Sequence, residues 1–343
     1  MRAATVADLY SFDEIIDARS PAEFAEDRVP GAVNLPVLDD AERARVGTLY
    51  KQVSPFEAKK VGAALVSRNI AHHLETFFAD KPKSWRPLVY CWRGGSRSGA
   101  MTHILQKVGF GAAQLDGGYK AYRRHVVAEL ERLSGLFSMR VVAGPTGSGK
   151  SRLLGALAEA GAQVLDLELL AAHRGSLLGA LPDRPQPSQK GFESALWQTL
   201  SGFRPERPVF VESESIRIGS LSVPATLIQA MRASPCVRVE VPIEERVQAL
   251  LDDYRHFFAA PEMLTRQLVH LTALRGGDTV GRWLELIARD DWAGLAHALL
   301  VEHYDPAYLK SLSNNYRPSD DDQTLPLPDL HPDTLARAAR ELA

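Results

Sequence analysis

The sequence predicts an α/β protein with two parallel-sheet domains, residues 1–135 and 136–343, the second carrying a helical C-terminal region. Short apolar strands alternate with helices in both parts of the chain, which favours parallel sheets. A chain of 343 residues also suffices for about two domains of roughly 150 residues each. The helical pattern is interrupted at Ser134-Gly135 and a strand begins again at Met139, so we place the boundary between them.

The composition is that of an ordinary globular protein, with 45% hydrophobic, 24% charged and 8% aromatic residues. No run approaches the ~18 apolar residues of a membrane span, and the acidic start lacks the apolar core of a secretory signal. Cys91 and Cys236 are far apart and form neither a CxxC pair nor a metal-ligand pattern. We therefore expect a cytoplasmic protein without a membrane partner.

The formal net charge of −2 argues against a protein that coats nucleic acid through positive charge alone. Net charge averages over surfaces that never meet a ligand. Binding of one folded RNA through a local basic face therefore stays open.

The first domain begins with a strand at Ile15–Asp17, and Ser20, Pro21 and Glu23 then form a strong helix start. A long helical region over 39–78 is interrupted by Pro55. The remaining expected elements are a strand at 87–90, a helix at 98–107, a strand at 113–115 and a helix at 119–133.

In the second domain, strands are expected at 139–143, 163–167, 208–211 and 237–241, with helices between them. The pattern over 243–302 is helical and rich in arginine. Residues 305–329 carry many Asn, Asp and Pro residues and are interpreted as an extended tail, followed by a last helix from about Thr334.

A phosphate-binding loop follows the strand at 139–143, because the sequence there fits G-x-x-x-x-G-K-[ST] between a strand and a helix. Its glycines let backbone N–H groups point at phosphate oxygens, the lysine reaches the terminal phosphates, and the final serine would hold Mg²⁺. The candidate phosphate-binding residues are Gly144, Thr146, Gly147, Ser148, Gly149, Lys150 and Ser151.

Such a loop does not say which phosphate compound binds or whether it is hydrolysed. Glu212 and Asp166 end neighbouring apolar strands and are candidates for the acid that accompanies a P-loop, and a solvated acid at a strand end is the alternative for each. A P-loop kinase or ATPase therefore remains an alternative interpretation.

A second reactive loop follows the strand at 87–90 and precedes a helix. Backbone N–H groups at the helix start and two arginines would favour the thiolate of its cysteine, giving a nucleophile and an anion pocket together. The candidate residues are Cys91, Arg93, Gly94, Gly95, Ser96 and Arg97.

Two chemistries fit this Cys-x₅-Arg loop, phosphoryl transfer in a cysteine phosphatase and sulfur or selenium transfer in a rhodanese. Tyr90 stands where phosphatases usually have histidine. The pattern Asp17-x-Arg19-Ser20-Pro21-x-Glu23-Phe24, with Leu115-Asp116-Gly117-Gly118 later, resembles rhodanese domains. Sulfur or selenium transfer is the preferred interpretation. Cys236, which opens an apolar strand, is expected in the core.

The chain as a whole resembles the bacterial tRNA 2-selenouridine synthase family, in which a rhodanese-like domain precedes a P-loop domain. Besides the two loops, the resemblance rests on segments at 166–168, 173–176, 186–189, 192–193 and 211–215. It implies a transferase that acts on tRNA carrying wobble 2-thiouridine. Selenium would come from selenophosphate, and geranyl diphosphate would donate a geranyl group to the sulfur.

The same resemblance assigns the two loops. The P-loop, with Lys150 and Mg²⁺, would hold the diphosphate of geranyl diphosphate, and Arg174 would grip phosphate as well. Cys91 would act on selenium, either as a perselenide carrier or by assisting attack and departure at the base. S-geranylation would turn the sulfur into a better leaving group.

The helical region carries arginines that we expect in part to face tRNA phosphates, and a salt-bridged surface is the alternative. A non-enzymatic RNA-binding module that senses anions is a further rival. These arginines are Arg246, Arg255, Arg266, Arg275, Arg282 and Arg289.

Overall fold

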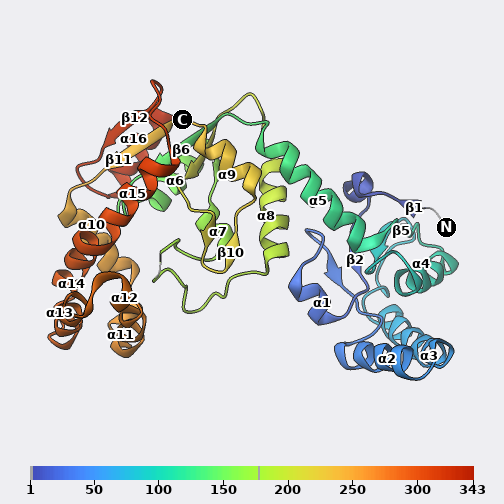
Figure 1. The fold of residues 1–343 in the computed structure, drawn as a ribbon. Helices are drawn as coiled ribbons and strands as arrows, with labels where there is room; N and C mark the ends of the chain where they lie inside the picture. The colour runs from blue at the N-terminus through green and yellow to red at the C-terminus, as the bar shows by residue number, and fades with distance from the viewer. Residues whose placement is uncertain (1–2, 177) are drawn as a thin grey trace. The chain divides into compact units, whose positions relative to one another are not determined.

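The computed structural model describes residues 3–176 and 178–343. The chain divides into two compact units (Figure 1), each described by itself below. The N-terminal unit ends at Glu129 and also includes Pro187–Gln198, and the C-terminal unit contains Leu130–Gln186 and Thr199–Ala343.

A parallel sheet forms the centre of the N-terminal unit, with strand order β1-β5-β4-β2-β3. Its strands are β1 (Ala3–Ala4), β2 (Glu14–Asp17), β3 (Val33–Asn34), β4 (Pro87–Tyr90) and β5 (Ala113–Leu115). The helical elements are η1 (Val6–Ser11), α1 (Pro21–Glu26), α2 (Asp40–Gln52), α3 (Pro55–Glu75), α4 (Ser96–Val108), α5 (Gly118–Ser134) and α8 (Gln189–Ser201), of which α5 and α8 continue into the other unit.

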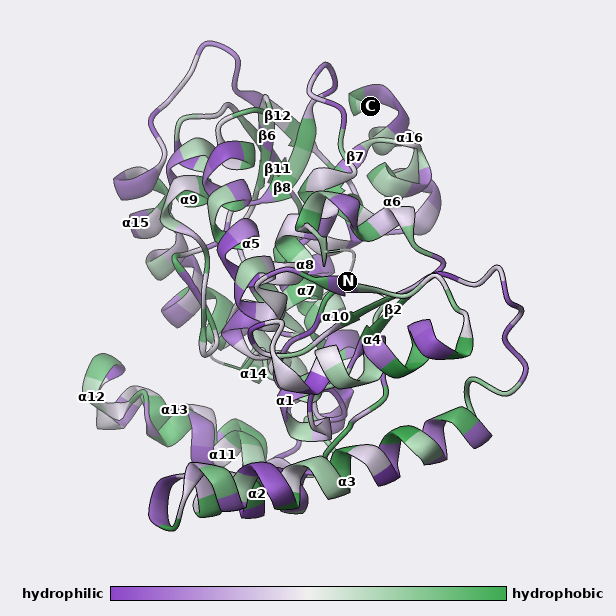
Figure 2. Ribbon diagram, turned by 90° about the vertical axis from the view of Figure 1, so that its right-hand side faces the viewer, coloured by the Kyte–Doolittle hydropathy of each residue, from purple (hydrophilic) through white to green (hydrophobic). Residues whose placement is uncertain are grey.

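Local sequence signals explain several of these helix ends. Ser20 caps α1, and Glu23 completes the reciprocal capping box that the sequence predicts. Pro55 does not kink one long helix but opens α3, with Ser54 as its cap. Helices α2 and α3 therefore form an antiparallel pair (Figure 2), and α3 alternates hydrophilic and hydrophobic residues along its length.

An ion pair lies inside the core of this unit. Arg19 and Asp17 are both fully buried, and Arg19 Nη2 lies 2.6 Å from Asp17 Oδ2. The same nitrogen donates to the carbonyl of Asp27 at 2.6 Å, and the guanidinium carbon lies 4.0 Å from the Tyr119 ring centroid. The charge is thus partnered on several sides, as a buried charge must be.

The first part of α8 completes the N-terminal unit. Arg123 of α5 forms an ion pair with Glu193 and donates to Ser194 Oγ at 3.1 Å. The Tyr122 and Trp197 rings pack edge to face with centroids 5.7 Å apart. Trp197 is 5% exposed and is therefore a core residue.

A second parallel sheet forms the centre of the C-terminal unit, with strand order β12-β11-β6-β8-β7. Its strands are β6 (Met139–Ala143), β7 (Gln163–Leu165), β8 (Val209–Glu212), β11 (Cys236–Glu240) and β12 (Gln323–Pro326), and β9 (Arg217–Ile218) pairs separately with β10 (Leu221–Ser222). Helices near the sheet are α6 (Lys150–Glu159), α7 (Leu167–Ala171), α9 (Ala225–Arg232) and α16 (Pro332–Leu342).

The C-terminal part of the chain is mostly helical, as the sequence predicts. Its elements are α10 (Ile243–Asp253), η2 (Arg255–Phe257), α11 (Pro261–Val269), α12 (Thr272–Arg275), α13 (Gly277–Ala288), α14 (Trp292–Leu299), η3 (Leu300–Tyr304) and α15 (Asp305–Asn315). Within the described residues, no helix combines the length and apolar character needed to cross a bilayer.

The expectation of an extended tail over 305–329 is wrong. Residues 305–315 form α15, which continues in helical backbone directly from α14 and η3, and the π-helical turn at η3 lies next to Pro306, which has no N–H to donate. Residues 323–326 form β12, which pairs with β11 from Val237↔Gln323 onward. The segment therefore supplies β12 as an edge strand of the sheet and α15 as a helix near the P-loop.

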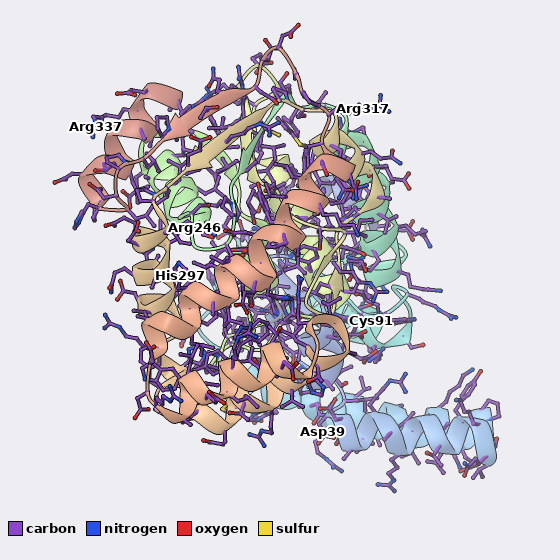
Figure 3. All side chains as sticks on the ribbon, turned by 60° about the vertical axis from the view of Figure 1, so that its left-hand side comes forward. Asp39, Cys91, Arg246, His297, Arg317 and Arg337 are labelled. Atoms are coloured by element: carbon purple, nitrogen blue, oxygen red, sulfur yellow. The ribbon has the colours of Figure 1, made fainter. Side chains whose placement is uncertain are left out.

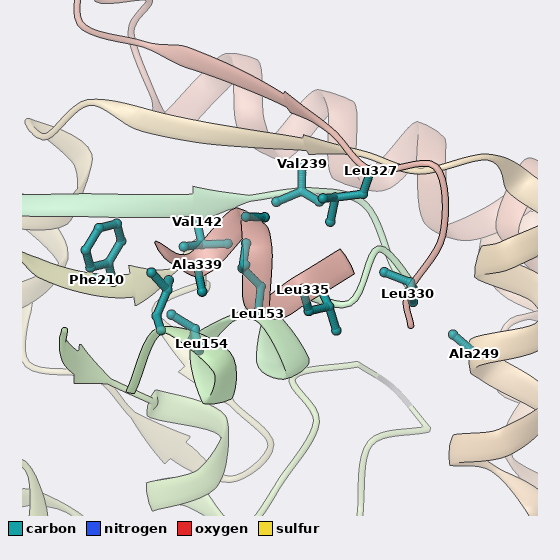
Figure 4. Packing of buried hydrophobic residues seen from close by; sticks show 12 residues of the cluster. Val142, Leu153, Leu154, Phe210, Val239, Ala249, Leu327, Leu330, Leu335 and Ala339 are labelled. Atoms are coloured by element: carbon teal, nitrogen blue, oxygen red, sulfur yellow. The ribbon is translucent and has the colours of Figure 1, made fainter. Parts of the chain in front are cut away.

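The core of the C-terminal unit lies between its sheet and the helices α6 and α16 (Figure 4). Val142 and Phe210 from the strands pack against Leu153 and Leu154 of α6 and Ala339 of α16. Cys236, at the start of β11, is 1% exposed, which confirms its prediction as a core residue. This packing holds β6 and α6 in place, and the P-loop connects these two elements.

Candidate active site

Cys91 stands where β4 ends and the loop to α4 begins, as the sequence predicts. Its side chain is buried, and Ser98 Oγ donates a hydrogen bond to Cys91 Sγ at 3.1 Å. Gln114 Nε2 donates to Ser98 Oγ at 2.9 Å and also to the carbonyl of Gly94. Residues from α4 and β5 therefore hold the sulfur and its loop in one geometry.

Glycine is required next to this loop. Gly118 has φ +55°, and a Cβ there would lie 2.3 Å from the carbonyl oxygen of Cys91 and 2.4 Å from the nitrogen of Gly94. Those atoms are backbone, so the loop would have to move. The backbone N–H of Tyr119 also donates to the Cys91 carbonyl at 2.8 Å, which ties α5 to the loop.

We expect Gly118→Ala to reduce any activity that depends on Cys91 by at least tenfold, because backbone strain and a backbone clash act together. Gly31→Ala is the matched control, since Gly31 has φ +76° but open space around its Cβ position. The rate of the reaction that depends on Cys91 is the measurement. Equal losses of activity in the two variants would show that the backbone clash at Gly118 does not cause the loss.

The two arginines of the loop lie in different surroundings. Arg93 is exposed and has no ion pair among the described residues. Arg97 Nη1 lies 2.6 Å from Glu23 Oε2, so its guanidinium is held by α1. Although burial acts to raise the pKa of Glu23, the hydrogen bond and charge of Arg97 lower it. Gly95 caps α4 and Ser96 begins it.

The P-loop connects β6 to α6 in the C-terminal unit. Gly147 and Gly149 have φ +78° and +75°, which only glycine adopts without strain. A Cβ at Gly144 would lie 2.4 Å from Ser148 Oγ. Lys150 Nζ donates to the carbonyl of Gly144 at 2.8 Å, so the ammonium group lies over the loop.

Arg246 of α10, which is labelled in Figure 3, contacts the P-loop through its guanidinium group. Its Nε and Nη2 donate to the carbonyl of Thr146 at 3.0 and 2.8 Å. Asp305 of α15 accepts from the same guanidinium, and the arginine side chain is only 7% exposed. Arg246 therefore positions the loop and is not free for a tRNA phosphate, which corrects one expectation for the helical region.

The other arginines of that region mostly have protein partners. The Arg275 guanidinium donates to His303 Nδ1 at 3.0 Å and to the backbone carbonyl of His303 at 2.9 Å. The pairs Arg255–Asp252, Arg282–Glu302 and Arg289–Glu285 lie on the surface, and Arg266 is exposed. These ion pairs agree with a salt-bridged surface, and tRNA binding by the exposed arginines of this region stays a prediction.

Carboxylates gather beside the P-loop. Ser151 Oγ donates to Glu168 Oε2 at 2.7 Å, and the backbone N–H of Glu168 donates to Glu212 Oε1 at 2.7 Å. Burial, followed by the charges of Asp166, Glu168 and Glu214, raises the pKa of Glu212 well above its usual range. Burial and the Glu168 charge raise the pKa of Glu214 to about 8, although Lys150 acts in the opposite direction.

These raised pKa values predict a pH dependence of stability. A folded state that keeps a proton on Glu214 up to about pH 8 gains stability at low pH. The free energy of unfolding should therefore fall as pH rises from about 4.3, the pKa of an unfolded glutamate, and level off above the folded pKa.

Urea unfolding at pH 5, 6, 7 and 8 in the presence of a chelator measures this slope. We expect Glu214→Gln to reduce the fall in unfolding free energy between pH 5 and pH 8 by about a few kcal/mol, because glutamine resembles the protonated acid and does not titrate. Glu262→Gln, at an exposed glutamate of α11, should keep the wild-type slope. Parallel curves for all three proteins would show that Glu214 is not protonated in the folded state.

The oxygen groups next to Lys150 suit Mg²⁺. Glu212 Oε2 is buried and has no hydrogen-bond partner among the described residues. No group of three or more His, Cys, Asp or Glu side chains in the described part is arranged to hold a metal by itself. Mg²⁺ usually binds one or two carboxylates together with substrate phosphates and water, so Ser151, Glu168 and Glu212 fit it.

A cavity of about 570 Å³ opens over the P-loop. Arg174 lines it, with its guanidinium 5.0 Å from the Tyr254 ring centroid and a hydrogen bond to the carbonyl of Asp253. The cavity thus brings together the predicted P-loop residues and Arg174, with Glu168 and Glu214 beside them. Glu212 lies behind Glu168, to whose backbone it bonds.

Sequence reasoning missed the contribution of η3 and α15 to this cavity. Tyr304, Tyr308 and Asn315 line it, and Lys150 Nζ lies 6.0 Å from the Tyr308 ring centroid. Tyr308 lies one helical turn after both Tyr304 and Asp305, at spacings of four and three residues. That spacing was a signal of a helix face within the segment interpreted as a tail.

Comparisons with known proteins agree with this arrangement. Residues 137–267 match the family model of the tRNA 2-selenouridine synthase AAA domain, and residues 3–125 match that of the rhodanese-like domain. The tRNA 2-selenouridine synthase of Nitrosomonas europaea is 38% identical over 244 residues. That match covers 70% of this chain but 63%, less than two thirds, of the relative.

Two other relatives match over nearly their whole length. The tRNA 2-selenouridine synthase of Bdellovibrio bacteriovorus is 34% identical, over 88% of this chain and 89% of its own. That of Aeromonas salmonicida is 36% identical, over 88% of this chain and 87% of its own. With both loops in place and relatives of this similarity, the chain belongs to the tRNA 2-selenouridine synthase family.

Proposed function

We propose that the protein is a transferase that replaces the sulfur of wobble 2-thiouridine in tRNA by selenium. Selenophosphate would supply the selenium, and geranyl diphosphate would first alkylate the sulfur. One observation carries this proposal. The same chain holds a loop in which Cys91 is positioned by a hydrogen bond from Ser98 and a cavity that opens over a P-loop. A P-loop alone would fit many phosphate chemistries.

The P-loop cavity would perform the alkylation. Backbone N–H groups of Gly147 to Lys150, together with the Lys150 ammonium and Arg174, would bind the diphosphate. The bond between geranyl C1 and its oxygen breaks, and diphosphate leaves with the electron pair. The thiouridine sulfur forms the new bond to C1, and the N3 proton of the base is released. When bound, Mg²⁺ would neutralise charge on the departing diphosphate, held through Ser151 and the neighbouring carboxylates.

The Cys91 loop would perform the selenium step. Its backbone N–H groups at the start of α4 suit an anion such as selenophosphate, and Cys91 is positioned by Ser98 to act on selenium. The selenium of selenophosphate would form the bond to carbon 2 of the base, and the geranylated sulfur would leave with the electron pair of the C2–S bond and take up a proton as geranyl thiol. Water would then attack phosphorus, so that the P–Se bond breaks, phosphate departs and selenium stays on carbon 2. Alkylation matters because a thiol departs far more readily than the original thione sulfur.

Nucleoside mass spectrometry on 2-thiouridine tRNA, with Mg²⁺, geranyl diphosphate and selenophosphate, tests both assignments. We expect the wild type to form selenouridine, Cys91→Ser to stop at the geranylated base, and Lys150→Ala to leave the base unchanged. Cys236→Ala, at a buried core cysteine, should form both products.

Two outcomes would overturn the proposal. Consumption of ATP without any change in the base would favour the P-loop kinase or ATPase interpretation instead. Intact tRNA binding without chemistry in any assay would favour a non-enzymatic RNA-binding module.

A further inference from the structure

The antiparallel helices α2 and α3 (Figure 2) carry an excess of basic over acidic residues. From residue 43 to residue 68 the chain has six basic side chains and one acidic side chain, although its formal net charge as a whole is −2. We call this stretch the basic hairpin. All six basic side chains are exposed, and they are Arg43, Arg45, Lys51, Lys59, Lys60 and Arg68.

Most of these cations have no acidic partner. Among the ion pairs of the described residues, the basic hairpin takes part in two, Arg43 with Glu23 at 3.9 Å and Lys60 with Glu57 at 2.8 Å. The other four cations have no ion pair in the described part of the chain. Exposed cations that lie together without partners repel one another, so an anionic ligand bound across them would be favoured.

The base of the basic hairpin lies beside the Cys91 loop, within the same unit. Glu23 Oε2 lies 2.6 Å from Arg97 Nη1 of that loop and 3.9 Å from Arg43 Nε of α2. From Arg43 to Lys51, α2 extends over about 12 Å. A row of cations therefore begins at the Cys91 loop and continues along the helix pair.

The turn between the two helices exposes three large apolar side chains. Tyr50 is 57% exposed, and Val53 and Phe56 are each 66% exposed. Lys60 Nζ lies 5.3 Å from the centroid of the Phe56 ring. Aromatic rings beside cations suit RNA, because unpaired bases stack on the rings while the cations contact phosphates.

The face of α3 beyond the turn favours RNA over a lipid surface. Between Lys60 and Arg68 its exposed residues are Ala63, Ala64 and Ser67, all of which are small. A helix that lies in a membrane interface needs large apolar side chains along its length, and this face has none. Small side chains instead let a phosphate backbone approach, with cations at both ends of a face about 12 Å long.

We propose that the basic hairpin is a binding surface for tRNA, in which its cations contact phosphates while Tyr50 and Phe56 stack on an unpaired base. The inference rests on the proposed function, in which tRNA is the substrate. Because the row of cations begins beside Arg97, a tRNA backbone that follows it leads to the Cys91 loop. The basic hairpin thus holds the tRNA whose base reacts at Cys91.

Equilibrium binding of the full chain to labelled tRNA that carries 2-thiouridine tests this surface, at about 50 to 200 mM KCl. We expect Lys51→Gln/Lys59→Gln to weaken binding about tenfold at about 100 mM KCl. The slope of the logarithm of the binding constant against that of the salt concentration should become shallower by about 1.5, because each phosphate contact contributes about 0.7–0.9.

The aromatic side chains are tested separately. Tyr50→Ala/Phe56→Ala should weaken tRNA binding by about tenfold or more, because a base loses its stacking partners. The salt dependence should keep the wild-type slope, since no charge is removed. This combination distinguishes stacking from a general loss of electrostatic attraction.

Lys83→Gln/Lys107→Gln is the matched control, because both lysines are exposed in the same unit and lie outside the basic hairpin. It removes the same charge and should change tRNA affinity by less than about twofold. Affinity for inorganic pyrophosphate should stay unchanged in every variant, because the P-loop belongs to the C-terminal unit. Unchanged urea unfolding midpoints show that the substituted surfaces leave the fold intact.

The outcomes separate this inference from the proposed function. Wild-type affinity and slope in Lys51→Gln/Lys59→Gln, or equal losses in that variant and its control, would overturn the basic hairpin as the tRNA surface and leave the proposed function standing. Binding to vesicles of equal parts phosphatidylcholine and phosphatidylglycerol that is lost in the hairpin variants, with tRNA affinity kept, would assign the surface to a membrane. A wild-type protein that does not bind the tRNA would overturn both.

Discussion

Replacing Arg19 by methionine is expected to destabilise the N-terminal unit by about 3–5 kcal/mol, because it leaves Asp17 as an unpaired charge in the core. The side chains are fully buried, so water cannot take over the partner's role. Urea unfolding followed by tryptophan fluorescence measures the loss, since Trp85 and Trp92 lie in this unit.

The control is an ion pair on the surface of the same unit. Lys60 and Glu57 lie 2.8 Å apart on α3 with both side chains about half exposed, and Lys60→Met should cost less than about 1 kcal/mol. The double variant Asp17→Leu/Arg19→Met should recover part of the loss, because no lone charge remains. A similar cost for Arg19→Met and Lys60→Met would refute the importance of burial.

The second large effect is expected for Arg246→Met, which removes two hydrogen bonds to the Thr146 carbonyl and leaves Asp305 without its partner. Bonds to charged groups contribute about 1.5–3 kcal/mol, so diphosphate affinity should fall on the order of 10- to 100-fold as the loop loses its support. Calorimetry with inorganic pyrophosphate measures this.

Arg282→Met is the matched control in the same helical region. Arg282 is 58% exposed and pairs with Glu302 at 3.2 Å, so its loss should change pyrophosphate affinity less than twofold. Arg246→Lys separates charge from geometry, because lysine keeps the charge but not the forked contact with carbonyl and carboxylate. Equal affinity losses in the methionine variants at 246 and 282 would argue against a positioning role for Arg246.

Structural features that depend on a few neighbouring residues were predicted correctly from the sequence. The capping box of Ser20 and Glu23 and the strand–loop–helix context of the P-loop are fixed by spacing along the chain. Cys236 in an apolar strand is a similar case. Hydrophobic alternation and cap chemistry act within one element, so the sequence displays them directly.

Contacts between distant residues could not be predicted in this way. Glu23 and Arg97 are 74 residues apart, and Thr146 and Arg246 are 100 apart. Which arginine turns inward depends on strand order and on helix placement, and these are set by packing of the whole unit. The prediction for residues 305–329 was wrong because Pro306, a residue typical of loops, lies here in a continuous helix next to the π-helical turn at η3.

The placement of residues 187–198 bears on whether the two units can exist as separate proteins. This stretch belongs to the N-terminal unit, although the chain on both sides of it belongs to the other. A gene split once near codon 135 would encode a first protein without Glu193 and Trp197, the partners of Arg123 and Tyr122. The second protein would carry α8 without the partners of its first part, and the Trp197 ring would lose its contact with Tyr122. The two units could therefore be separated into independent proteins only if residues 187–198 were supplied again to the first of them.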